Sequence, residues 1–160
     1  MIPPIASSPE QMLDRATMAS MSGLDYLRGL LEGRFPHPPI AGLMSYRMTE
    51  VAEGRVAFRA TAGFQHLNPM GTVHGGWYGT LLDSALGCAV MTRVPAGHWY
   101  TTLEYRVNLL RPVPLDSEVE AVATVRHAGR TTGVAEADIR GVADGKLYAT
   151  GSTTCLIMPV

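Results

Sequence analysis

The sequence contains little charge and little cysteine. Charged side chains make up 17% of its 160 residues, the formal net charge is −1, and the two cysteines are Cys88 and Cys155. These cysteines lie far apart and form no Cys-x-x-Cys or Cys/His cluster, so we expect neither a disulfide nor a metal site. A nearly neutral chain has no general attraction for nucleic acid or for an anionic membrane, and we expect neither as a partner.

Long apolar runs and targeting signals are also missing. No stretch reaches the ~20 uninterrupted apolar residues of a membrane-spanning helix. The N-terminal residues lack the basic start and the apolar run of a secretory signal. With 46% hydrophobic residues, a chain of this length can bury the core of one domain without disulfides. The sequence therefore predicts a soluble, cytoplasmic protein.

Residues 1–39 differ from the rest and predict a helical extension. Ser8-Pro9-Glu10 is typical of a helix start, because proline is favoured in the first turn, and this helix is expected to continue to about Met21. Residues 23–32 carry leucines at helical spacing and predict a second helix. Prolines at positions 36, 38 and 39 then end helical structure. The extension is either a cover packed on the main domain or a lid over a ligand tunnel.

Residues 40–160 predict one α+β domain. Runs of strand-forming residues between Gly- and Pro-containing turns predict strands, whereas the segment 76–92 is too long and too uniformly apolar for one and predicts the main helix. The predicted strands cover residues 43–51, 55–61, 100–110, 118–127, 133–142 and 146–157. The order β-β-α-β-β-β-β fits one antiparallel sheet wrapped around a long central helix.

Asp83 is the one ionisable group of this main helix near neutral pH. An unpaired carboxylate in an apolar interior is costly, so a helix that is apolar all round holds an Asp only for a reason. Asp83 either points to solvent or pairs with an arginine, or it lines a pocket. In a pocket, desolvation would raise its pKa and make it a stronger base.

The helix start at His74-Gly75-Gly76 offers the complementary half of a catalytic site. Its unpaired backbone N–H groups and the positive end of the helix dipole can polarise a thioester carbonyl and stabilise an oxyanion. Gly75 and Asp83 are eight residues apart, which places them ~12 Å apart along one helix. Both cannot contact one thioester carbon. If both are catalytic, they come from different subunits of a homodimer.

Four motifs in order resemble the hotdog-fold acyl-CoA thioesterases, specifically their phenylacetate-pathway (PaaI-like) group. The first is the run Asn68-Pro-Met-Gly-Thr-Val-His74-Gly75-Gly76, and the second is Asp83, nine residues after the histidine. The third is the run from Thr102 to Arg111-Pro112, and the fourth is the turn Gly129-Arg130. The resemblance covers about residues 40–158. It implies a hotdog fold, with the N-terminal helical extension of residues 1–39 added to a thioesterase domain of residues 40–160.

The resemblance also implies roles for individual residues. Asp83 would activate water as general base or attack the thioester as nucleophile. Gly75 N–H would hold the carbonyl oxygen, assisted by His74. Asn68 would orient the water or the carboxylate, and Thr102 would hydrogen-bond the water. Without the resemblance, Asn68 is better explained as a turn former and Thr102 as a strand residue.

Gly87 departs from the related 4-hydroxybenzoyl-CoA branch, which usually has a threonine four residues after the acidic one. The departure favours the phenylacetate-type branch, in which Thr102 takes that role. Candidate substrate-binding residues, whose basic members can pair with coenzyme A phosphates, are Gly76, Arg111, Arg126, His127 and Arg130. Candidates for the acyl pocket are Met70, Trp77, Tyr78 and Leu82. For the basic candidates the alternative is a solvated turn. For the acyl-pocket candidates the alternative is ordinary core packing.

The predicted function is hydrolysis of a small acyl-CoA thioester by an Asp-centred site at a dimer interface. No cofactor is expected, because coenzyme A is part of the substrate. The expected partners are the acyl-CoA and the chain itself, as a homodimer that further assembles into a dimer of dimers. Hydratase chemistry is the second enzymatic possibility, but the Asp-x-x-x-x-His segment it would use is missing. A non-catalytic acyl-CoA-binding hotdog protein is the alternative outside enzymes.

Overall fold

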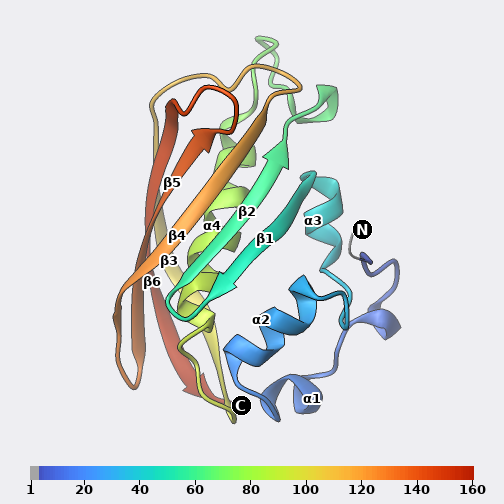
Figure 1. The fold of residues 1–160 in the computed structure, drawn as a ribbon, viewed down its shortest axis with the longest axis vertical. Helices are drawn as coiled ribbons and strands as arrows, with labels where there is room; N and C mark the ends of the chain where they lie inside the picture. The colour runs from blue at the N-terminus through green and yellow to red at the C-terminus, as the bar shows by residue number, and fades with distance from the viewer. Residues whose placement is uncertain (1–3) are drawn as a thin grey trace.

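The computed structural model describes residues 4–160 and shows one sheet curved around one long helix (Figure 1). The sheet is antiparallel, in the order β1-β2-β4-β5-β6-β3. Its strands are β1 (Tyr46–Ala52), β2 (Arg55–Thr61), β3 (His98–Leu109), β4 (Glu118–Ala128), β5 (Thr132–Gly141) and β6 (Leu147–Pro159). The helices are η1 (Pro9–Gln11), α1 (Arg15–Ala19), α2 (Gly23–Leu31), α3 (Pro39–Leu43), η2 (Phe64–His66) and α4 (Gly75–Met91). The predicted α+β architecture is therefore confirmed.

The central helix α4 is buried because its sides are apolar nearly all round. Most of its 17 residues are inaccessible to solvent, and Asp83 is among the few that remain partly exposed. The strands around it alternate between buried and more exposed residues, as β4 and β5 show, so the inner face of the sheet is apolar and the outer face polar. This packing gives the molecule a single apolar core, which α4 runs through.

The first predicted helix, residues 8–21, is wrong as a single element. Ser8 makes no capping hydrogen bond with its side chain, and only the short turn η1 follows it. The α-helix starts instead after Asp14, whose carboxylate accepts a hydrogen bond from the Thr17 N–H at 2.8 Å. A proline near the start was therefore a weaker signal than a carboxylate that can cap. The second predicted helix, 23–32, is confirmed as α2.

Helix α3 was not predicted, because the prolines before it were interpreted as a stop. Pro39 occupies the first turn of α3, where a missing N–H costs no hydrogen bond. The chain then turns at Ser45, which has a positive φ of 54°, so β1 begins at Tyr46 instead of residue 43. The other strands and α4 lie within a few residues of their predicted bounds.

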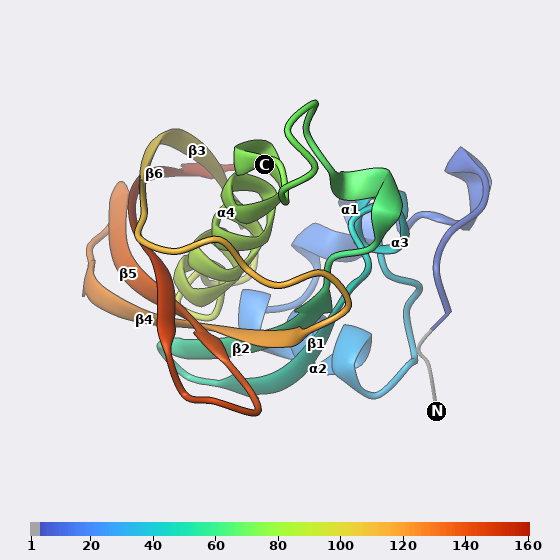
Figure 2. The same ribbon diagram turned by 90° about the horizontal axis from the view of Figure 1, so that it is seen from above.

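The N-terminal helices lie beside β1 and the open side of the curved sheet (Figures 1 and 2). Leu27 and Leu30 of α2 are 1% and 4% exposed and belong to the same apolar core as α4. The Gly23 N–H donates to the Val94 carbonyl oxygen at 2.9 Å, which ties the start of α2 to the residues that follow α4. The division of the chain at residues 39 and 40 stays a prediction. Among residues 4–160, no helix has the length and hydropathy needed to cross a membrane.

Candidate active site

One face of α4 consists of small residues around a single carboxylate. Gly75, Gly79, Asp83 and Gly87 follow one another at intervals of four residues and therefore lie along one side of the helix. This side faces β3, one of the two edge strands of the sheet, as the contacts of each residue show. The spacing was visible in the sequence, where it would have indicated that the helix face beside Asp83 is approached closely by another element.

The residues of β3 that meet this face are large. A methyl group at Gly75 would lie 3.2 Å from Leu109 Cδ1, and one at Gly79 would lie 3.3 Å from the Tyr105 hydroxyl oxygen. At Gly87, a methyl group would lie 2.5 Å from the hydroxyl oxygen of Tyr100, which leaves no room for a larger side chain. The packing of a tyrosine from β3 thus favours the glycine at position 87, which departs from the hydroxybenzoyl branch.

Asp83 is half-buried and bound to β3. Its Oδ1 accepts a hydrogen bond of 3.1 Å from the Thr102 hydroxyl, so the structure brings together two of the predicted catalytic residues. Burial raises the pKa of the Asp83 carboxyl above its usual value, and the hydrogen bond from Thr102 opposes part of that increase. No arginine pairs with Asp83 among the described residues. The carboxylate therefore combines raised basicity with partial access to solvent.

Asp83 lies at an apolar cavity of about 200 Å³. The walls come from α2, the 37–41 segment, β1, β2, α4 and the start of β3, and they include five aromatic side chains. Two polar groups in the wall bond to each other, because the Tyr46 hydroxyl and Ser84 Oγ are 2.8 Å apart. Cys88 also lines the cavity, but burial raises the pKa of its thiol to about 12, which keeps it protonated and excludes it as the nucleophile.

The candidates proposed for the acyl pocket from sequence do not line this cavity. Trp77, Tyr78 and Leu82 are at most 2% exposed and pack in the core, and Met70 is 86% exposed in the loop before α4. Those four predictions are therefore wrong for the cavity at Asp83. Its walls include α2 and the 37–41 segment, and their distance from Asp83 in sequence left no local pattern by which to find them.

The start of α4 presents one free backbone donor. His74 caps the helix, because its Nδ1 accepts a hydrogen bond from the Gly76 N–H at 2.8 Å. The Gly76 N–H is therefore occupied within the chain and the His74 ring faces it. In contrast, no acceptor among residues 4–160 takes the Gly75 N–H. Gly75 is the donor available to a bound carbonyl oxygen at this terminus.

A groove of about 310 Å³ at the same terminus brings three predicted residues together: Asn68, Gly75 and Arg111. The Asn68 side chain holds its own loop, because its Oδ1 accepts from the N–H groups of Met70 and Thr72 at 2.9 and 3.2 Å. This contact is what a turn former makes, and a role for Asn68 in catalysis stays a prediction. Arg111 donates to the Leu147 carbonyl oxygen at 2.7 Å.

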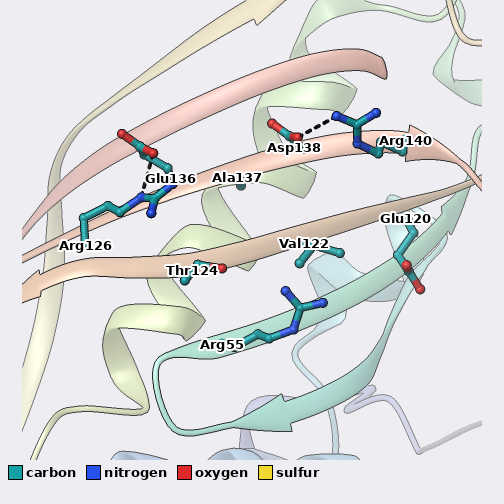
Figure 3. Close-up of a pocket in the computed structure, with 9 residues that line it drawn as sticks. All are labelled: Arg55, Glu120, Val122, Thr124, Arg126, Glu136, Ala137, Asp138 and Arg140. Carbon is teal, nitrogen blue, oxygen red and sulfur yellow. Dashed lines mark hydrogen bonds and ion pairs between the residues drawn. The ribbon is translucent and has the colours of Figure 1, made fainter. Parts of the chain in front are cut away.

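The other basic candidates lie elsewhere. Arg126 is ion-paired with Glu136 at 2.7 Å on the outer face of the sheet, in a hollow of about 390 Å³ where arginines and carboxylates alternate (Figure 3). His127 and Arg130 are exposed around the turn between β4 and β5. This turn lies at the opposite end of α4 from Gly75, since Gly133 packs on Val90. Their role in phosphate binding stays a prediction.

Comparisons with known proteins find similarity to thioesterases. The model of the Thioesterase superfamily matches residues 70–148. Mouse acyl-coenzyme A thioesterase 13 is 31% identical over 90 residues, which cover 56% of this chain and 64% of that protein. The chain thus spans less than two thirds of the length of this relative.

Solved structures show the same fold. A phenylacetic acid degradation-related protein of Ralstonia eutropha is 28% identical, with a TM-score of 0.75 over 82% of this chain and 98% of that one. A hypothetical thioesterase of Streptococcus pneumoniae, solved with coenzyme A, is 27% identical, with a TM-score of 0.65 over 72% and 87%. The matched residues 70–148 contain both Gly75 and the Asp83–Thr102 pair. The chain therefore has a hotdog fold and is similar to the thioesterase superfamily, including a protein related to phenylacetic acid degradation.

Proposed function

We propose that this protein hydrolyses small acyl-CoA thioesters. The observation that carries the proposal is the Asp83 carboxylate, which lies at an apolar cavity, is bound by Thr102 and has a raised pKa. A carboxylate with these properties suits proton abstraction from water at neutral pH. The cavity suits the acyl group, because an apolar chain or ring gains from leaving water there.

Hydrolysis follows from these parts in two steps. Asp83 takes a proton from water while the water oxygen attacks the thioester carbon, and the Gly75 N–H stabilises the oxyanion that forms. The tetrahedral intermediate then expels the coenzyme A sulfur, and that sulfur receives the proton that Asp83 had taken, which gives the free acid and the thiol and restores the carboxylate. Direct attack by the Asp83 carboxylate, followed by hydrolysis of the anhydride, would give the same products.

The two catalytic parts belong to different subunits in this mechanism. Gly75 and Asp83 lie ~12 Å apart along α4, so one thioester cannot contact both within one chain. Strand β3 pairs with β6 on one side only and forms the edge of the sheet, and it carries the exposed apolar side chains of Leu103, Tyr105 and Leu109. An exposed apolar edge strand is suited to pairing with a second copy of itself.

The contacts along β3 favour one register for this pair. Thr102 lies at Asp83 and Leu109 lies at Gly75, so an antiparallel pair must place Thr102 opposite the partner's Leu109. Pairing centred on Arg106 does so. Thr102 lies four residues before Arg106 and Leu109 three residues after it, and the bulge between Thr102 and Glu104 accounts for the extra residue on the Thr102 side. The two-fold axis would then bring Asp83 of each chain to Gly75 of the other. A dimer of dimers and a cytoplasmic location remain predictions.

The test is release of free thiol from a panel of acyl-CoA substrates by the wild type and by Asp83→Asn. The substitution preserves the shape of the side chain and removes the base, so kcat should fall about 10²–10⁴-fold. A thioether analogue such as S-benzyl-CoA should bind both proteins equally. Near-normal turnover by Asp83→Asn would refute the mechanism. Binding of the analogue by a wild type that releases no thiol would establish the non-catalytic binding protein instead.

A further inference from the structure

We propose that the N-terminal segment from Tyr26 to Ala41 is the specificity-determining wall of the acyl pocket, limiting the acyl group to about the size of one six-membered ring. The inference rests on the proposed function and names the size class of its substrate.

The size of the cavity sets the limit. Its volume is about 200 Å³, and an apolar protein cavity of roughly 150 Å³ is known to accept benzene. The space beside Asp83 therefore accommodates a single ring or a short aliphatic group, and a long unbranched chain does not fit. Phe58, Trp99 and Tyr100 are among its lining residues, and aromatic side chains pack well against such a group.

The N-terminal segment forms one side of this space. Leu27 and Leu30 of α2 and Ala41 of α3 line the cavity, and all three are at most 4% exposed. The segment lies outside residues 70–148, which carry the family match and Asp83. The catalytic carboxylate and the wall that limits the acyl group thus come from separate parts of the sequence.

The wall is fixed in place by several contacts, which distinguishes it from a lid. The His37 side chain is 3% exposed, and its Nε2 lies 3.1 Å from the Leu30 carbonyl oxygen. The Ala6 N–H donates to the His37 carbonyl oxygen at 2.9 Å. At the start of α2, Gly23 packs so closely on the Met91 carbonyl that a side chain there would overlap it. A wall held in place by these contacts selects the acyl group by its size.

The lining is also largely free of unpaired polar groups. Tyr46 and Ser84 satisfy each other, and burial lowers the pKa of His37 so that its ring is neutral. A negatively charged acyl substituent would have no partner of opposite charge among the lining residues and would be repelled by Asp83. The pocket therefore disfavours an anionic acyl group and favours a compact one.

Two substitutions in the wall test the proposal in opposite directions. Ala41→Leu fills the pocket and should lower kcat/KM for benzoyl-CoA about tenfold or more, while kcat/KM for acetyl-CoA stays within about twofold. Leu30→Ala enlarges it and should raise the ratio of kcat/KM for decanoyl-CoA over butyryl-CoA about tenfold. The control is Ile139→Ala in β5, which removes a buried aliphatic side chain away from the cavity. It should leave unchanged the kcat/KM ratio of benzoyl-CoA over acetyl-CoA and that of decanoyl-CoA over butyryl-CoA.

Affinity for S-benzyl-CoA, relative to free coenzyme A, gives a readout that does not need turnover. Ala41→Leu should reduce this ratio by about tenfold, and the control should not. Unchanged ratios in both wall variants would overturn the proposal, as would an equal change in Ile139→Ala. If no thioester is hydrolysed but Ala41→Leu still lowers the S-benzyl-CoA ratio, the wall is upheld and the hydrolase function fails.

Discussion

Gly75 and Asp83 lie on the same face of α4 but have different surroundings. At the N-terminus, Gly75 offers a free N–H in an open groove of about 310 Å³ shared with Asn68 and Arg111. Two turns further along, Asp83 lies at a cavity of about 200 Å³ with aromatic walls. The groove suits the polar carbonyl and the charged carrier, and the cavity suits the apolar acyl group. In the proposed mechanism each half needs a second chain, because one chain keeps the two groups apart.

After the loss of Asp83, the largest expected effect comes from removing the free donor. Gly75→Pro deletes the N–H at the first helical position, which tolerates proline, and the extended backbone of His74 (ψ 138°) is suited to a following proline. We expect kcat to fall about 10²–10³-fold, measured by thiol release. Gly75→Ala is the matched control, since it keeps the N–H and introduces the same contact with Leu109. Equal losses in both variants would remove Gly75 from the mechanism.

Mixing Gly75→Pro with Asp83→Asn tests whether each active site takes Gly75 from one chain and Asp83 from the other. A heterodimer would have one site with both native groups and one with neither. Equal mixing after dissociation should therefore restore about a quarter of the wild-type activity from two inactive proteins. No recovery, with heterodimers verified by mass, would show that each site is built within one chain.

A smaller effect, cross-linking between the two chains, tests the strand register of the proposed dimer interface. In a pair centred on Arg106, the two copies of this residue have Cα atoms roughly 4.5–5.5 Å apart, which is within disulfide range. Arg106→Cys should cross-link to a covalent dimer under mild oxidation, as seen on a non-reducing gel. Arg140→Cys, on β5 in the interior of the sheet, should remain a single chain. Equal behaviour of the two variants would contradict the register.

The smallest effect concerns the pH dependence of the Asp83 half. Burial raises the pKa of Asp83, and the hydrogen bond from the Thr102 hydroxyl opposes part of that increase. The acidic limb of the pH profile of kcat/KM should therefore lie above the usual pKa range of a carboxyl group. Thr102→Val removes the opposing hydrogen bond, so the limb should move to higher pH and kcat/KM at neutral pH should fall about tenfold. Thr102→Ser should keep the wild-type profile. An unmoved limb in Thr102→Val would mean that another group titrates.

Local sequence patterns predicted the parts of the fold whose causes are local. The uniform apolarity of α4 and the turn residues between strands were sufficient to predict the sheet and its central helix. The Asp83–Thr102 pair came from the family resemblance, since no local pattern links a helix residue to a strand 19 residues later. Helix α3 was missed because a proline can end one helix and begin another, and only the packing of Ala41 decides between them.

The cavity wall could not be predicted for a different reason. Tyr26, Leu30 and Ala41 reach Asp83 only after α2 and α3 have packed against β1 and α4. In the sequence they form the apolar side of short helices, which is typical of any cover. The choice between a cover and a pocket wall depends on the volume left between packed elements, and residue spacing does not encode that volume.

The state of the two native cysteines has a practical consequence. Burial raises the pKa of both thiols, that of Cys88 to about 12, and Cys155 is fully enclosed. Colorimetric thiol reagents react with thiolates, so the folded protein should contribute almost no background signal when they titrate liberated coenzyme A. The same inertness leaves an introduced surface cysteine as the sole site for labelling, and fluorophores or spin probes can be attached without first replacing the native residues.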